Sequence, residues 1–185
     1  MAKVDQLLEN YRRHLGPRWP NAIAGKERVW FAVYDNGDER RIRLRIDDFA
    51  AATKQAGHGW EQIDLTDTFA RWMATHDYRE AYFASPEDLD ADAVAGYEES
   101  LAEEICELLT GANADTNSVV ALIGCGSLFG ITRLSLLLGK IDSHIRGRLL
   151  VFFPGSYDEG HGYRLMEAKR DWNYLAVPIT AHQGT

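Results

Sequence analysis

The sequence predicts an α/β protein: a single three-layer domain over residues 1–185, with a mainly parallel sheet of about five strands covered by helices. Short apolar runs rich in β-branched and aromatic residues alternate with stretches of helical spacing, an order typical of parallel sheets. Residues 118–153 also read as strand, glycine turn, helix and strand, and two buried strands joined by one helix should lie parallel. No internal repeat or linker-like tract divides the sequence, which favours one domain.

The first half of the chain predicts three helices and two strands. These are a helix at 3–15, a strand at 29–34, a helix at 39–56, a strand at 60–65, and a helix that is capped by Thr66 or Asp67 and carries Phe69, Trp72 and Met73. The segment 39–56 is ambiguous, because arginines alternate with apolar residues over 41–46 as in a strand. A helical apolar stripe runs through the whole segment with Leu44 as its single misfit, so one continuous helix is favoured.

The second half predicts the centre of the sheet. Its elements are a short helix and surface loop within 76–96, a helix at 94–110, a strand at 119–123, a helix with Leu128, Ile131, Leu134, Leu138 and Ile141 on its inner face, a strand at 149–153 and a last strand at 174–180. Ser127 is the predicted N-cap of the helix between the central strands, because its hydroxyl can accept a backbone N–H. Pro154 and Gly155 should close the following strand, and a polar loop and a helical or irregular segment at 164–172 should come next.

Charge and composition restrict the function classes. The chain has 28 acidic and 20 basic residues and a formal net charge of −8, so direct DNA binding is expected to be weak. Cys106 and Cys125 share no C-x-x-C spacing, which is typical of a reduced, cytosolic setting. The charged N-terminus lacks the apolar core of a signal peptide, and no apolar run is long enough for a bilayer. We expect a cytoplasmic protein.

The turn Gly124–Ser127 is the first candidate ligand site. Backbone N–H groups at a glycine turn between strand and helix can bind phosphate. Two nucleotide patterns fail here, since Ile131 stands where a P-loop has lysine and Phe129 where a dinucleotide fingerprint has glycine or alanine. A tight structural turn is the favoured interpretation, and a degenerate nucleotide-binding domain remains the alternative.

Catalytic and metal-binding interpretations are weaker. Asp35 and Asp38 follow a predicted strand and could supply oxygen ligands to a divalent metal, but an acidic turn with a helix cap is the simpler explanation. Cys125 lies at a strand-to-helix turn, which can activate a thiol, but its candidate bases, His58 and His161, have no spacing that indicates contact. We expect no metal, no cofactor and no catalytic residue.

Two further polar groups have open interpretations. Asp158, Glu159 and His161 could form a site on a glycine-rich loop, or they could be an ordinary exposed loop. The arginines could meet acidic side chains of a partner or a phosphate backbone, but solvated or internally paired side chains are favoured. These arginines are Arg40, Arg41, Arg43 and Arg45 in the first half, and Arg146 and Arg148 before the strand at 149–153.

Several stretches in a fixed order resemble the BrxB family, the small component of bacteriophage exclusion (BREX) systems. The resemblance runs from the first helix to the last strand, and its specificity lies in the joint order of the motifs. The stretches are VWFAVYD with DERR, ATKQAGHGW, SLFG, RGRLLVFFPG, YRL and WNYLAVPI.

The resemblance implies membership of a prokaryotic anti-phage operon. Other components of such systems include an adenine DNA methyltransferase, a large AAA+ ATPase and PglZ, a protein of the alkaline-phosphatase fold. The family has no established catalytic motif to carry over, so the expected role is a non-enzymatic assembly subunit that bridges larger BREX components. PglZ is the first partner to test and the ATPase the second. The expected contact residues are Tyr78, Tyr82, Phe83, Arg41 and Arg45, because interfaces favour tyrosine, other aromatics and arginine.

Overall fold

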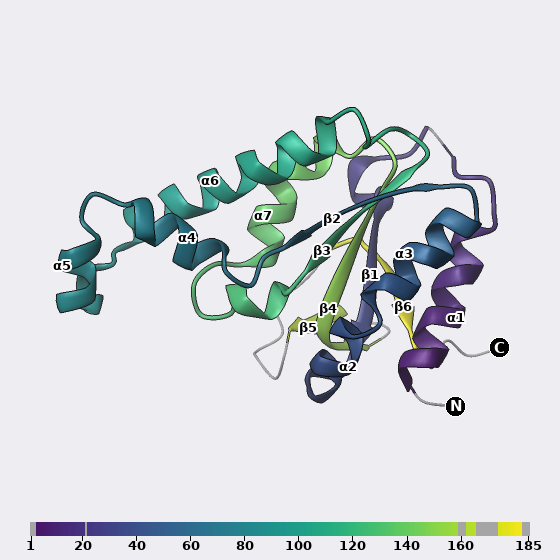
Figure 1. Ribbon diagram of the computed structural model, residues 1–185, viewed down its shortest axis with the longest axis horizontal. Helices are drawn as coiled ribbons and strands as arrows, with labels where there is room; N and C mark the ends of the chain where they lie inside the picture. The colour runs from purple at the N-terminus through teal and green to yellow at the C-terminus, as the bar shows by residue number, and fades with distance from the viewer. Residues whose placement is uncertain (1–2, 21, 159–161, 166–173, 183–185) are drawn as a thin grey trace.

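The computed structural model describes residues 3–20, 22–158, 162–165 and 174–182 (Figure 1). Within these residues, five parallel strands form a sheet in the order β2-β3-β4-β1-β6. The strands are β1 (Val29–Tyr34), β2 (Gly59–Asp64), β3 (Ser118–Ile123), β4 (Arg148–Asp158) and β6 (Val177–Thr180). A further strand, β5 (Gly162–Leu165), pairs antiparallel with the end of β4. The predicted α/β fold with a mainly parallel sheet is confirmed.

Helices cover both faces of this sheet (Figure 1). One face carries α1 (Lys3–Leu15), α2 (Glu39–Arg43) and α3 (Ile46–Gln55), and the other carries α4 (Thr68–Thr75), α6 (Ala91–Thr110) and α7 (Leu134–Ile141). The connection from β1 to β2 passes over β4 and β3 on the face that carries α2 and α3. The connections from β2 to β3 and from β3 to β4 lie on the opposite face. Short 3₁₀ turns lie at Gly25–Arg28, Asn36–Asp38, Pro86–Asp88, Cys125–Leu128 and Asp142–His144.

The central strands divide their side chains between two cores. In β1 and β4, residues at odd positions, such as Phe31 and Val151, face α6 and α7, and residues at even positions, such as Trp30 and Phe152, face α1 and α3. This follows from the two-residue period of a strand. Phe31 lies opposite Val151 across the β1–β4 ladder, so the same two strands support both cores.

The helix expected at 39–56 is wrong as a single element. α2 ends at Arg43 and α3 begins at Ile46, and Leu44 at the break is 78% exposed. Arg43 binds Asp64 at the sheet edge, and Arg45 binds Asp5 of α1. The chain therefore bends between two arginines that are held by different elements.

The helix expected to begin at Ser127 is also wrong. Residues 125–128 form a 3₁₀ turn, and α7 begins only at Leu134. The Ser127 hydroxyl donates to the carbonyls of Leu65 and Gly124 and therefore caps no helix. Gly130 has a φ of +81°, which a right-handed helix cannot include. The sequence suggested one continuous helical stripe because Leu128 and Leu134 are both apolar and both buried. They nevertheless lie in different elements.

The strand expected at 149–153 is longer than predicted. β4 continues through Pro154 and Gly155 to Asp158, and the polar loop expected there pairs instead with β5. Pro154 lies opposite Tyr34 of β1. Of the predicted polar loop cluster, Asp158 ends β4, whereas Glu159 and His161 lie outside the described residues. The segment expected at 164–172 is described only at 164 and 165, which belong to β5.

Candidate functional site

The carboxyl ends of the parallel strands meet at one edge of the sheet, where α/β proteins place their ligand sites. A network around Arg43 fills part of this edge. The Arg43 guanidinium donates from Nε to Glu39 (2.8 Å), from Nη1 to Asp64 (2.9 Å) and from Nη2 to the Thr66 hydroxyl (2.5 Å). The Tyr34 hydroxyl donates to the same Glu39. Arg43 thus connects α2 to the end of β2, and Glu39 connects α2 to the end of β1.

Protonation states in this network are set by burial and hydrogen bonds. Burial alone would raise the pKa of Asp64, but hydrogen bonds from Thr66 and the guanidinium of Arg43 outweigh it and lower that pKa below its ordinary value. Burial, followed by the bond to Glu39, raises the pKa of Tyr34. At neutral pH the network therefore holds an ionised Asp64, a cationic Arg43 and a neutral Tyr34.

The glycine turn predicted as a phosphate site lies against this network. A Cβ atom at Gly124 would come within 2.5 Å of Thr66 Oγ1, 2.7 Å of Asp64 Oδ1 and 2.8 Å of Arg43 Nη2. Gly124 also has a φ of +74°. The requirement for glycine therefore has two structural causes, a left-handed backbone and close packing, and side chains of the chain itself fill the space beside the turn.

Cys125 in this turn is not placed as a nucleophile. Its side chain is fully buried, and burial, with the nearby charges of Glu39 and Asp64, raises its pKa. His58, its predicted base, stacks on Trp19 with ring centroids 3.8 Å apart and lies 2.8 Å from Asn117 Oδ1. The other predicted base, His161, lies outside the described residues.

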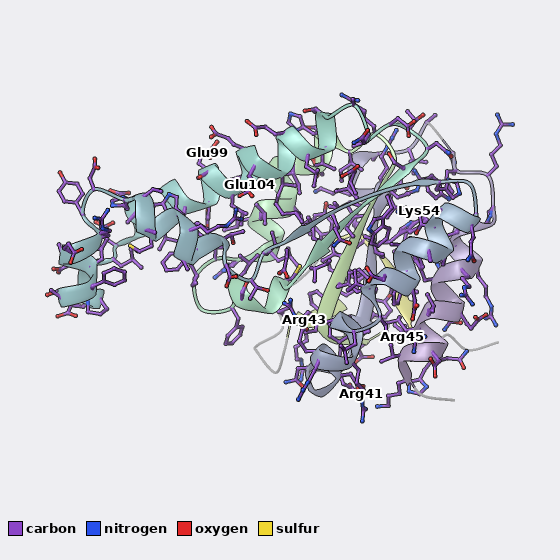
Figure 2. All side chains as sticks on the ribbon, viewed as in Figure 1. Arg41, Arg43, Arg45, Lys54, Glu99 and Glu104 are labelled. Carbon is purple, nitrogen blue, oxygen red and sulfur yellow. The ribbon has the colours of Figure 1, made fainter. Side chains whose placement is uncertain are left out.

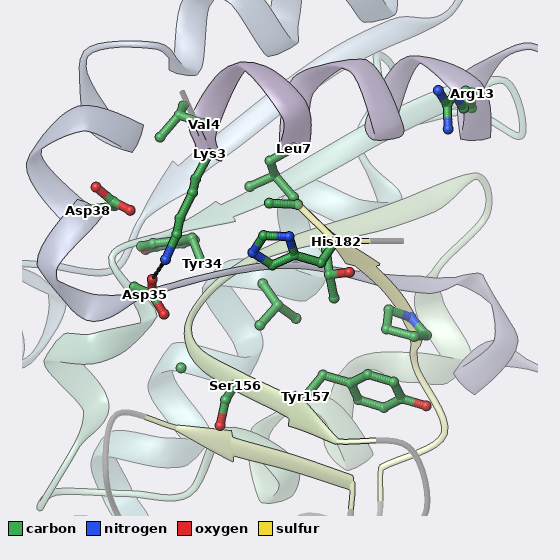
Figure 3. Close-up of a pocket in the computed structure, with 15 residues that line it drawn as sticks. Lys3, Val4, Leu7, Arg13, Tyr34, Asp35, Asp38, Ser156, Tyr157 and His182 are labelled. Carbon is green, nitrogen blue, oxygen red and sulfur yellow. Dashed lines mark hydrogen bonds and ion pairs between the residues drawn. The ribbon is translucent and has the colours of Figure 1, made fainter. Parts of the chain in front are cut away.

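A cleft of about 580 Å³ lies beside the network, between α1, the ends of β1 and β6, and residues 155–157 of β4 (Figure 3). Figure 3 shows Lys3 of α1 reaching Asp35 at the end of β1, at a distance of 2.6 Å between Nζ and Oδ2. Ser156 and His182 also line the cleft. Asp35 does not join Asp38 in a metal site, because Asp38 pairs with Arg41 at 2.7 Å. Among the described residues, no group of three or more potential metal ligands gathers.

The two predicted interface arginines lie at α2 and its junction with α3 (Figure 2). Arg41 has a side chain that is 75% exposed and bound to Asp38. Arg45 is less exposed and binds both Asp5 and Asp48. Both side chains are therefore already paired with carboxylates of the chain.

The predicted aromatic contact residues lie elsewhere. Tyr78 and Phe83 are each 67% exposed, and Tyr82 packs its ring 5.3 Å from that of His76. All six residues of α5 (Arg79–Ala84) are described, and none is buried. Figure 1 shows α5 at the end of a projection beyond the sheet, far from α2. The structure therefore does not bring the aromatic and arginine candidates together.

The arginines before β4 serve the fold. Arg146 donates to the carbonyls of Thr110 and Ala114. Arg148 is 4% exposed, and its guanidinium lies 5.0 Å from the ring centroid of Trp19. Of the two favoured interpretations, solvated or internally paired side chains, internal pairing describes both arginines.

Sequence reasoning missed the network around Arg43 and the cleft with His182. Polar residues at the end of β2 and just after it, Asp64 and Thr66, were an available signal for the network, because the carboxyl ends of parallel strands meet at one edge. The cleft had no such signal, since its residues come from both ends of the chain.

Comparisons with known proteins identify a family. A family model described as "BREX protein BrxB" matches residues 62–179, which is more than half of the chain. The match includes α5 and the turn at Gly124 and leaves out α1, α2 and α3. Searches of curated proteins and of solved structures found no match. Within the described residues, no helix is long and apolar enough to cross a membrane. The chain therefore belongs to the BrxB family, whose members are components of BREX anti-phage defence systems.

Proposed function

We propose that this protein is a non-catalytic assembly subunit of a BREX complex, which bridges larger components such as a PglZ-like protein and the AAA+ ATPase. The observation that carries the proposal is the exposure of Tyr78 and Phe83 around a helix without a buried residue. Large aromatic side chains at such positions are typical of protein contacts. Both residues lie within the region that matches the family model.

The state of the reactive side chains supports an assembly role. The thiol of Cys125 is buried and its pKa is raised. At the carboxyl edge of the sheet, Asp64 is bound by Arg43 and Asp35 by Lys3. General acid–base and nucleophilic catalysis need groups that can reach a substrate, and these groups are occupied within the chain.

Co-purification tests the proposal. The tagged protein is expressed with the PglZ-like protein, the ATPase and the methyltransferase of its own system, and co-elution is measured by size-exclusion chromatography. We expect a stable complex with the PglZ-like protein, and a larger one when the ATPase is present. Failure to associate with any of the three components would contradict the proposal.

Variants separate the two candidate surfaces. The double variant Y78A/F83A removes the aromatic contacts, and R41E/R45E reverses the charge at the other surface. Leu136→Ala is the matched control, because Leu136 is an exposed apolar residue on α7. We expect Y78A/F83A to reduce co-elution and L136A to leave it unchanged. An undiminished complex in both double variants would place the contact outside the four mutated residues.

A further inference from the structure

The charge of this protein is concentrated in one part of the chain. Residues 76–110 contain eleven acidic residues and one basic residue, a formal charge of −10, so the rest of the chain carries +2. The net charge of −8 is therefore not a general property of the surface. It belongs to α5, the turn at Pro86–Asp88 and α6.

The acidic residues nearest α5 form few ion pairs with basic side chains of the described residues. Here the arm denotes residues 77–92, which include α5. Its acidic residues are all exposed: Asp77, Glu80, Glu87, Asp88, Asp90 and Asp92. Among the ion pairs of the described residues, the one that reaches the arm joins Glu80 to the adjacent Arg79. Asp90 also accepts a hydrogen bond from the backbone of Ala93 at the start of α6. Farther along α6, by contrast, Glu99 binds Lys140 and Glu104 binds Arg71 (Figure 2).

An ordered aromatic stack holds the base of the arm. Phe69 and Trp72 of α4 pack on Tyr97 of α6, with ring centroids 5.1 and 5.7 Å apart. His76 continues the stack 4.8 Å from Trp72, and it contacts Tyr82 of α5. The buried Tyr97 anchors this stack to the core. The arm is thus presented from a packed base, which reduces the ordering cost of an encounter.

We propose that the arm is a docking element for a basic protein groove: Tyr78 and Phe83 enter apolar pockets of the partner, and Lys or Arg side chains around those pockets pair with the acidic residues of the arm. This inference rests on the proposed assembly function and names its surface and the chemistry of the partner. The acidic charge selects a basic surface by complementarity. It also repels DNA phosphates and anionic membranes, which makes a protein the fitting occupant.

The face of this chain around Arg41 and Arg45 is not the groove in question. Arg41 is bound to Asp38, and Arg45 to Asp5 and Asp48. Docking the arm of a second copy there would require these ion pairs to be replaced. The basic groove is therefore assigned to a different protein.

The test measures the affinity for the BREX component that co-elutes with the full chain, as a function of NaCl concentration. One variant removes the aromatic anchors, Y78A/F83A, and a second neutralises three acidic residues of the arm, E87Q/D88N/D92N. The matched control neutralises three acidic residues outside the arm, E61Q/E103Q/E107Q. Circular dichroism and thermal unfolding of each variant verify the fold, which should persist because none of the mutated arm residues is buried.

We expect the wild-type affinity to fall steeply between about 50 and 500 mM NaCl, because the pairs are exposed at the rim of the contact. Y78A/F83A should weaken binding by at least about tenfold. The triple arm variant should weaken binding at low salt and flatten the salt dependence, and the control should stay within about twofold of wild type.

The outcomes separate this inference from the proposed function. If the wild type binds a BREX component and both arm variants bind equally well, the docking inference is wrong and the assembly function stands. If the wild type binds none of the components, both are wrong. Binding of wild-type protein to duplex DNA that the arm variants abolish would assign the arm to nucleic acid and overturn the choice of a protein partner.

Discussion

At the scale of single residues, packing at the carboxyl edge of the sheet depends on the close approach of three polar side chains to the backbone of Gly124. Gly124 allows Arg43, Asp64 and Thr66 to meet beside the turn after β3. The guanidinium of Arg43 lowers the pKa of Asp64 together with the hydrogen bonds of Thr66. The contribution of this carboxylate to stability is therefore present above its unfolded-state pKa of 3.8 and is lost as the pH falls through its lower folded-state value.

A pair of glycine substitutions tests this close packing. Gly124 and Gly130 both have a positive φ, of 74° and 81°, but a Cβ at Gly130 would meet no described atom within 4 Å. Gly130→Ala should cost about 1–2 kcal/mol from backbone strain alone. Gly124→Ala should cost about 2–5 kcal/mol, because overpacking against the network adds to the strain. Urea unfolding measures both, and equal losses would contradict the packing argument.

At the scale of elements, α5 differs from the other helices in what it buries. Its six residues are all exposed or half-exposed, whereas the eight-residue α7 buries Leu134, Leu137, Leu138 and Ile141. Isolated helices of this length are marginal in water, so packing decides their stability. The position of α5 is set by its aromatic neighbours, and the helix itself has few contacts that resist local opening.

Hydrogen exchange of the native protein should distinguish these two short helices. We expect the amides of α5 to exchange much faster than those of α7, because local opening of α5 exposes no core side chain. When the BREX partner is added, α5 should gain protection and α7 should not change. Equal protection of both helices in the free protein would show that α5 is stabilised by contacts other than burial.

At the scale of the whole molecule, two cores share the central strands. Phe31 packs on the side of α6 and α7, where it stacks with Phe153 at 5.0 Å. Phe49 of α3 packs on the opposite side, edge-on to Phe152 at 5.0 Å. Phe152 and Phe153 are neighbours in β4, so loss of packing on one face disturbs the strand that supports the other. The prediction of one domain over residues 1–185 implies that both cores unfold together.

Two core truncations test this coupling. Phe31→Ala and Phe49→Ala remove fully buried rings from opposite cores, and each should destabilise the protein by about 3–5 kcal/mol. We expect a single denaturant transition in both variants, with tryptophan fluorescence and circular dichroism coinciding. Two separated transitions in either variant would mean that the cores unfold independently.

Local pattern predicted the fold class and many of the elements. The strand at 29–34 agrees with β1 residue for residue, and the helix at 3–15 agrees with α1. The errors have tertiary causes that local pattern cannot detect. Pro154 and Gly155 continue a strand because the neighbouring strands β1 and β5 pair with it. Leu128 and Leu134 share a core without sharing a helix.

The site was less predictable than the fold. The exposure of Tyr78 and Phe83 agrees with the surface role that was predicted for them, and their part in an interface stays a prediction. The pairing of Arg45 with Asp5 was not foreseen, because Asp5 is distant in sequence and meets Arg45 only through the packing of α1 on α3.

The sequence by itself determined the alternation of strands and helices, the family and the acidic charge of residues 76–110, because these depend on residue type and local spacing. Tertiary structure decided that α2 and α3 are separate, that Arg43 fills the space beside Gly124, and that α5 stands apart from α2. Each of these depends on strand order, which brings residues distant in the chain to one edge of the sheet. Local pattern contains no information about that order, so the surface available to a partner could be identified only from the tertiary structure.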